Sequence, residues 1–171
     1  MQVMPTATAI PTPGMPATVI RADRIAAPRV LKGSLNDLLQ VMGADPGDQK
    51  LATQMPMTLR RVHAKAQLFH EGQAAEAIYI VRAGTFKVYH TDEEGYEHVV
   101  AFPGQGDVMA LDSLYLAQHP TAATALEESS VYVILRHDFQ ALCMNAPGFS
   151  RALHLASSRA VKRATDLSHV M

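Results

Sequence analysis

Residues 78–102 decide the fold, and their sequence is IYIVRAGTFKVYHTDEEGYEHVVAF. The apolar run that opens this stretch ends in a turn at Gly84. From Thr85 to His90 the side chains alternate in character, and a two-residue period is typical of a half-buried strand. A polar turn that closes on Gly95 follows, and residues 98–102 then form a second apolar strand. The stretch therefore predicts a β-hairpin.

Further short strands are predicted on the C-terminal side of this hairpin. Residues 103–107 form another turn, and residues 121–125 and 130–135 have the composition of strands. Several short strands separated by regularly spaced turns are typical of a double-sheet jelly roll or a barrel. We therefore expect a mainly β domain over residues 59–136, with helices on its flanks.

The segment before this domain predicts a tail and a short helical lead-in. Residues 1–30 are rich in Pro, Ala and Thr without periodicity, so we expect a disordered tail. Within residues 31–58, Ser34 is a candidate helix cap. Leu35, Leu38, Leu39 and Met42 then recur at helical spacing, before Gly43 ends the helix. A second short amphipathic helix is predicted over residues 48–55.

The segment after the domain, residues 137–171, predicts a short helix and then a long one. The long helix covers residues 149–171 and carries a stripe of apolar residues spaced by three or four. The candidate dimer-helix residues in this stripe are Leu153, Ala156, Ala160, Ala164 and Leu167. Small residues let two helices approach closely, so a dimer seam is one interpretation. The other is a helix that packs back on its own sheet.

Composition narrows the class of protein. The chain is 48% hydrophobic with a formal net charge of -1, which gives no overall basic bias towards nucleic acid. The lone Cys143 excludes an intramolecular disulfide framework and a site made only of cysteines. Apolar runs are too short to span a bilayer, and the N-terminal stretch lacks the pattern of a signal peptide. We therefore expect a cytoplasmic protein with no membrane contact.

The order of several short motifs resembles the Crp/Fnr family of bacterial transcription regulators. The motifs are Leu68–Gly72, Tyr79–Tyr89, Glu94–Asp107, Leu111–Leu114 and His119–Glu127. The last two are more similar to the oxygen-responsive Fnr branch than to the cAMP-binding Crp branch. Glu94 stands where the family often has Asp, which leaves the turn intact.

This resemblance implies a cyclic-nucleotide-binding-like β-roll (a double-stranded β-helix), then a short helix and a long helix that pairs with its twin. In the family a helix-turn-helix DNA reader normally follows, whereas this chain stops at Met171. We therefore expect an effector-sensing and homodimerising domain, in which DNA would be contacted only through a domain absent from the chain. A stand-alone module that pairs with another regulator is the alternative.

The pocket implied by the resemblance lacks the usual contacts to cAMP. The family binds the ribose and the phosphate through a Glu and an Arg, and the matching positions here hold Leu111 and Thr121. We therefore expect no cAMP binding by those contacts and an unknown effector. The effector-pocket candidates are Met109, Ala110, Leu111, Asp112, Thr121 and Ala122. The competing interpretation is that these residues fill the core of the roll.

No cofactor or catalytic residue is predicted. The Fnr branch uses several cysteines for an iron–sulfur cluster, and they are missing here. The eight histidines are scattered, so the sequence predicts no metal site and no metal-dependent jelly-roll enzyme. The basic clusters Arg60-Arg61 and Arg159 with Lys162-Arg163 are expected to be solvated, and His119-Pro120 to be a simple turn.

Overall fold

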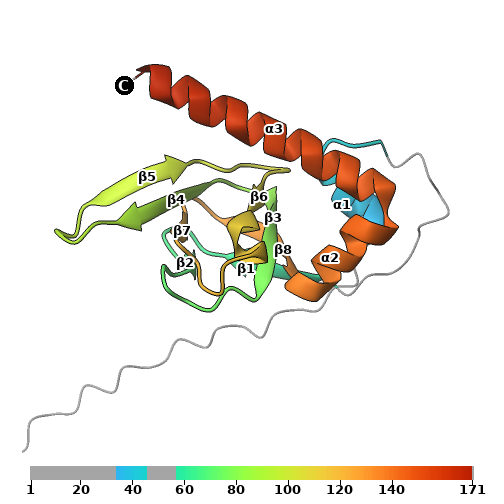
Figure 1. Ribbon diagram of the computed structural model, residues 1–171, viewed down its shortest axis with the longest axis horizontal. Coiled ribbons are helices and arrows are strands. Elements are labelled where there is room, and N and C mark those ends of the chain that lie inside the picture. Colours follow the sequence, from blue (N-terminus) through green and yellow to red (C-terminus); the bar gives the residue numbers. More distant parts are fainter. Residues whose placement is uncertain (1–33, 46–56, 171) are drawn as a thin grey trace, which may run out of the picture.

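A computed structural model describes residues 34–45 and 57–170 of the chain. Two four-stranded antiparallel sheets form a jelly roll, with strand orders β1-β8-β3-β6 and β2-β7-β4-β5. Helix α3 runs across the roll, and α1 and α2 pack at one end of it (Figure 1). The strands are β1 (Thr58–Val62), β2 (Gln67–Phe69), β3 (Ala77–Ala83), β4 (Phe86–Thr91), β5 (Glu97–Ala101), β6 (Val108–Met109), β7 (Ala122–Ala125) and β8 (Ser129–Leu135). The helices are α1 (Leu35–Val41), the 3₁₀ turn η2 (Leu111–Leu114), α2 (Arg136–Asn145) and α3 (Pro147–Val170).

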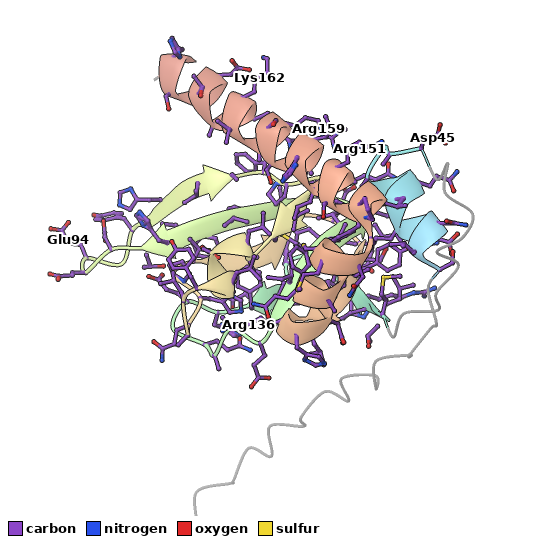
Figure 2. All side chains as sticks on the ribbon, turned by 45° about the vertical axis from the view of Figure 1, so that its right-hand side comes forward. Asp45, Glu94, Arg136, Arg151, Arg159 and Lys162 are labelled. Carbon is purple, nitrogen blue, oxygen red and sulfur yellow. The ribbon has the colours of Figure 1, made fainter. Side chains whose placement is uncertain are left out.

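The predicted fold class is confirmed. The deciding stretch forms β3, β4 and β5, and the predicted hairpin is the antiparallel β4–β5 pair, in which His90 lies opposite His98. Glu94 lies at the tip of this hairpin (Figure 2). The roll begins at Thr58, one residue earlier than predicted. The predicted tail and the second lead-in helix fall outside the described residues.

Strand β3 is apolar on both faces because each face meets a different hydrophobic core. Tyr79 and Val81 point into the roll, where they pack with Phe69 and Phe86. Ile78 and Ile80 point the other way, into a second core shared with the helices; its helical members include Leu38, Phe139, Phe149 and Ala156. A strand buried on both faces gives a continuous apolar run rather than alternation.

The predicted lead-in helix is confirmed as α1. The Ser34 hydroxyl accepts a hydrogen bond from the Asp37 backbone N–H at 3.1 Å, which satisfies one free donor of the first turn. The four apolar residues predicted at helical spacing are all buried in the second core: Leu35, Leu38, Leu39 and Met42. Gly43 follows with φ +76°, the left-handed conformation in which helices often end. No helix of the described residues is long and apolar enough to cross a membrane.

Replacing Gly106 by alanine is expected to destabilise the fold by about 2 kcal/mol or more. The residue has φ +83°, and an added Cβ would lie 2.6 Å from the Val41 carbonyl oxygen of α1. The left-handed conformation costs roughly 1–2 kcal/mol for a residue with a Cβ, and the backbone clash adds to that cost. Gly95→Ala is the matched control, because its φ is +90° and nothing lies within 4 Å of its added Cβ. Urea denaturation of both variants measures the difference, and equal losses would contradict the close contact with α1.

Candidate functional site

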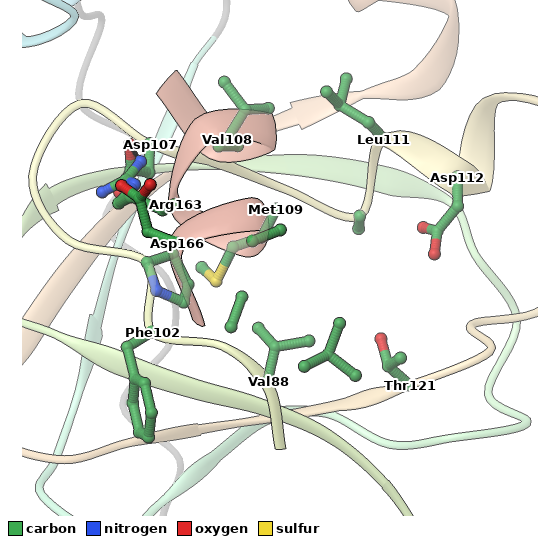
Figure 3. A pocket seen from close by; sticks show the side chains of 16 residues that line it. Val88, Phe102, Asp107, Val108, Met109, Leu111, Asp112, Thr121, Arg163 and Asp166 are labelled. Atoms are coloured by element: carbon green, nitrogen blue, oxygen red, sulfur yellow. Dashed lines mark hydrogen bonds and ion pairs between the residues drawn. The ribbon is translucent and has the colours of Figure 1, made fainter. Parts of the chain in front are cut away.

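A cavity of about 620 Å³ lies between the β-roll and the C-terminal half of α3 (Figure 3). Its size is in the usual range for small-molecule sites, roughly 300–1,000 Å³. The roll contributes Val88, residues 100–103, residues 107–112 and Thr121, and α3 contributes Ala160, Arg163, Ala164 and Asp166. Most of these side chains are apolar, so the cavity is an apolar space with a few polar groups at its margins.

One margin of the cavity is closed by an ion pair between the roll and α3. Arg163 Nη2 donates to Asp107 Oδ1 at 2.5 Å, and the Asp107 side chain is only 7% exposed. The other carboxylate oxygen of Asp107 accepts from the Gly104 backbone N–H at 2.8 Å. Contact with Asp107 raises the pKa of the Arg163 guanidinium above its ordinary value. Both charged groups are therefore already paired with each other.

The opposite margin carries Asp112 and Thr121 (Figure 3). Within the described residues, neither side chain makes a hydrogen bond or an ion pair. Asp112 belongs to η2, which is preceded by Ala110 in the left-handed conformation at φ +65°. A non-glycine residue in this region is uncommon, and such conformations cluster at functional sites. The Asp112 carboxylate lies at this margin of the cavity (Figure 3).

Five of the six predicted pocket residues line this cavity. They are Met109, Ala110, Leu111, Asp112 and Thr121. Ala122 does not: it lies in β7 with its side chain buried. Met109 is also part of the core of the roll, so the competing interpretation from the sequence holds for that residue as well.

The stripe on α3 packs against its own chain at Leu153 and Ala156, whereas Ala160 and Ala164 further along the helix are exposed. Ala156 is 2% exposed and Leu153 packs against the same core of sheet and helices. Ala160 and Ala164 line the cavity. Leu167 lies in α3, but its side chain is outside the described part of the chain. Ala156 is therefore a core residue and not part of an exposed seam, because the helix packs back on its own roll at that point.

One expectation about polar residues is incomplete and another is wrong. The basic cluster on α3 is exposed, as the sequence predicts, but two of its arginines also make contacts that the sequence does not indicate. Arg159 Nη2 donates to the Met42 carbonyl oxygen at 3.2 Å, and Arg163 bonds Asp107. These two arginines, one turn apart, hold α3 to α1 and to the roll (Arg159 is labelled in Figure 2). His119 was expected to lie in a simple turn, but it is buried at 2% exposure.

Other cavity residues were missed by sequence reasoning. Val88, Val100 and Phe102 form part of its apolar wall, and Asp107 and Arg163 close its margin. One signal for the wall was present: β5 is an edge strand, yet it carries a largely apolar run that the sheets do not bury. The ion pair gave no local signal, since its partners are 56 residues apart.

The buried His119 side chain contacts both η2 and the core of the roll. Its ring stacks on Phe69 with centroids 4.2 Å apart, and its Nδ1 shares a hydrogen bond of 3.1 Å with the Ser113 hydroxyl in η2. Nε2 is buried and has no hydrogen-bond partner in residues 34–45 and 57–170. Burial lowers the pKa of the imidazole below 6.5; Asp112 opposes this shift, and Arg136 adds to it. The folded chain therefore favours the neutral ring.

Acidification below about pH 6.5 is expected to destabilise the fold through His119. The ordinary imidazole pKa is about 6.5 in an unfolded chain, so the unfolded state binds the proton at a higher pH than the folded state does. The stability that the neutral His119 ring contributes is therefore complete above the unfolded-state pKa of about 6.5. It is lost progressively as the pH falls below that value. Urea denaturation between pH 5 and 8 measures the slope. His119→Gln should flatten it, and an unchanged slope in this variant would refute the assignment.

Cys143 is partly buried against the core of sheet and helices. Burial raises the pKa of its thiol, which disfavours the reactive thiolate. Among the described residues, no three His, Cys, Asp or Glu side chains come together as metal ligands would. Among the described residues, the ionisable side chains that line the cavity are those of Asp107, Asp112, Asp166 and Arg163.

Comparison with known proteins identifies the family. The family model described as the cyclic nucleotide-binding domain matches residues 59–146, just over half of the chain. The fumarate and nitrate reduction regulatory protein of Yersinia pestis is 32% identical over 100 residues, a match that covers 58% of this chain and 40% of that protein. The chain therefore spans well under half the length of this relative.

Solved structures share the fold. The c-di-GMP-responsive global regulator CLP of Xanthomonas campestris superposes with a TM-score of 0.59 at 18% identity, over 66% of this chain and 58% of that one. The catabolite activator protein of Thermus thermophilus gives a TM-score of 0.55 at 23% identity, over 67% and 54%. The chain belongs to the cyclic nucleotide-binding domain family, and the regulator of Yersinia pestis that it resembles is of the Crp/Fnr type.

Proposed function

We propose that this chain is the effector-sensing and dimerisation part of a Crp/Fnr-type transcription regulator, and that the cavity is its effector site. The observation that carries the proposal is that both the roll and α3 line one cavity. A ligand that touches both walls binds one position of α3 better than another, and such differential affinity shifts the population of helix positions. DNA would be contacted by a part of the regulator outside this chain.

We do not expect the cavity to bind a cyclic nucleotide in the usual mode. A cyclic phosphate needs a cation, and Arg163, the guanidinium that lines the cavity among the described residues, already pairs with Asp107. An unpaired phosphate in an apolar cavity would carry a large desolvation cost. Leu111 and Thr121, the positions that match the family's Glu and Arg, supply no charge.

The effector site is tested by titrating the isotope-labelled chain with 1-decanol, an uncharged apolar probe, and following amide NMR shifts. We expect shifts at residues 100–103 and 109–112 of the roll and at residues 160–166 of α3. Ala160→Phe should fill the cavity and abolish them. Val161→Phe is the matched control, because Val161 is 67% exposed and does not line the cavity. Equal binding by the two variants would refute the site.

Dimerisation is proposed through the face of α3 that the chain leaves uncovered. Val161 lies on this face, and Val99 on β5 is also exposed. A second chain that covered Val161 would remove its apolar side chain from water, which favours association. Leu155 is exposed as well, but its six-residue separation from Val161 places it about 120° away around a helix with 3.6 residues per turn.

Val161→Glu is expected to weaken the dimer at least tenfold, because a carboxylate would be placed in an apolar contact. Sedimentation equilibrium at micromolar concentration measures the dissociation constant. Leu155→Glu is the matched control and should leave the dimer intact, since it lies on another face of α3. A monomer in the unmodified chain, or a dimer unaffected by Val161→Glu, would overturn the proposed seam.

A further inference from the structure

We infer that the cavity selects a largely apolar small molecule that carries a cationic group, such as an ammonium, and rejects anions. The inference rests on the proposed function and deepens it by naming the chemical class of the effector. It follows from three features of the cavity: the balance of charge in its lining, the pairing of those charges, and the position of Asp112, which has no ion-pair partner in the part of the chain that the structure describes.

The lining holds more negative than positive charge. Asp107, Asp112 and Asp166 are its carboxylates, and Arg163 is its guanidinium. Asp166 also accepts from Lys162 Nζ at 2.8 Å on the exposed side of α3. With Asp107 paired to Arg163 and Asp166 to Lys162, Asp112 is the carboxylate of the lining without an ion-pair partner among the described residues.

Arg163 offers an anionic ligand no net positive charge, because Asp107 already neutralises it. The guanidinium uses one N–H group on Asp107, and its other N–H groups make no hydrogen bond within the described part of the chain. An anion that used them would also lie close to the Asp107 carboxylate, which repels it. Drawing Arg163 away from Asp107 would leave that carboxylate, 7% exposed, with only the Gly104 backbone N–H as a partner. A cation at Asp112 meets neither cost.

Asp112 is placed to receive a donor group. Its carboxylate and the Thr121 hydroxyl lie at the same margin of the cavity, across from the Asp107–Arg163 pair (Figure 3). An ammonium there would donate a charge-assisted hydrogen bond to the carboxylate, and such bonds are about twice as strong as neutral ones. The apolar body of the same molecule would lie against Val88, Met109 and Leu111.

The test is isothermal calorimetry of the full chain with three probes that share a ten-carbon chain: decylamine, 1-decanol and decanoate. We expect decylamine to bind tightest, 1-decanol next, and decanoate at least tenfold more weakly than decylamine. In the Asp112→Asn variant, the dissociation constants of decylamine and decanoate should lie within threefold of each other. Asp138→Asn is the control for overall charge, because Asp138 lies on α2 and does not line the cavity.

A second variant should narrow the preference for the amine. Asp107→Asn removes the partner of Arg163, so it should strengthen decanoate binding at least threefold. Equal binding of amine and acid by the unmodified chain, or an Asp112→Asn variant that keeps the tenfold preference, would overturn the inference while leaving the effector site in place. If none of the three probes binds, the proposed effector site fails together with the inference.

Discussion

The Ala156→Glu variant is expected to lose about 3–5 kcal/mol of unfolding free energy, the usual cost of an uncompensated buried charge. Ala156 is 2% exposed in the core that joins α3 to the first sheet. A carboxylate there would have to leave water without a partner, or α3 would have to leave the roll. Urea denaturation followed by far-UV circular dichroism measures the loss.

The sequence left two interpretations of this position open, and the variant separates them. If Ala156 belonged to an exposed dimer seam, the substitution would lower stability only at concentrations where the dimer forms. Measuring the unmodified chain and the variant at two protein concentrations, twentyfold apart, distinguishes the cases. We expect the same loss at both, and Val161→Glu to change monomer stability by only about 0.5 kcal/mol. A loss seen only at the higher concentration would contradict the placement of Ala156.

The Phe86→Ala variant is expected to lose about 3–5 kcal/mol, because it leaves a void in a close-packed core. Phe86 begins β4 and is fully buried inside the roll with Val81 and Val131. Phe102→Ala is the matched control, since the same ring is removed from a position that is 50% exposed on the cavity wall. Thermal and urea denaturation give the two stabilities.

The control variant also reports on the cavity. Phe102→Ala should change stability by less than about 1 kcal/mol yet weaken 1-decanol binding, because its ring covers the ligand and not the core. Similar losses of stability in Phe86→Ala and Phe102→Ala would contradict the separation of the roll interior from the cavity. Unchanged decanol affinity in Phe102→Ala would contradict the assigned wall.

The strands and the lead-in helix could be predicted because their signals are local. The β4–β5 hairpin follows from alternation around Gly95, and α1 follows from the Ser34 cap and four apolar residues at helical spacing. The resemblance to the family then supplied the order of the roll and the helices. Such signals depend on neighbours in the sequence, which a single chain displays directly.

The wall of the cavity that α3 contributes could not be predicted, because it is formed by contacts between residues far apart in the sequence. The apolar stripe on α3 indicates that the helix has a partner, but not whether the partner is its own roll or a second chain. The structure resolves that choice for Ala156 and shows the cavity beside Ala160 and Ala164. The Asp107–Arg163 pair and the burial of His119 likewise depend on segments that meet only in the folded chain.

The central claim is that a ligand between the roll and α3 changes the position of that helix. Spin labels at Arg61 on β1 and Ser168 on α3, both exposed, in a Cys143→Ala background would measure the distance distribution between the roll and the helix by pulsed electron resonance. Position 168 does not line the cavity, so this label leaves the Lys162–Asp166 pair intact. We predict that saturating decylamine shifts this distribution and that the same concentration of decanoate leaves it close to that of the free chain. An unchanged distribution with calorimetrically saturated decylamine would contradict the account.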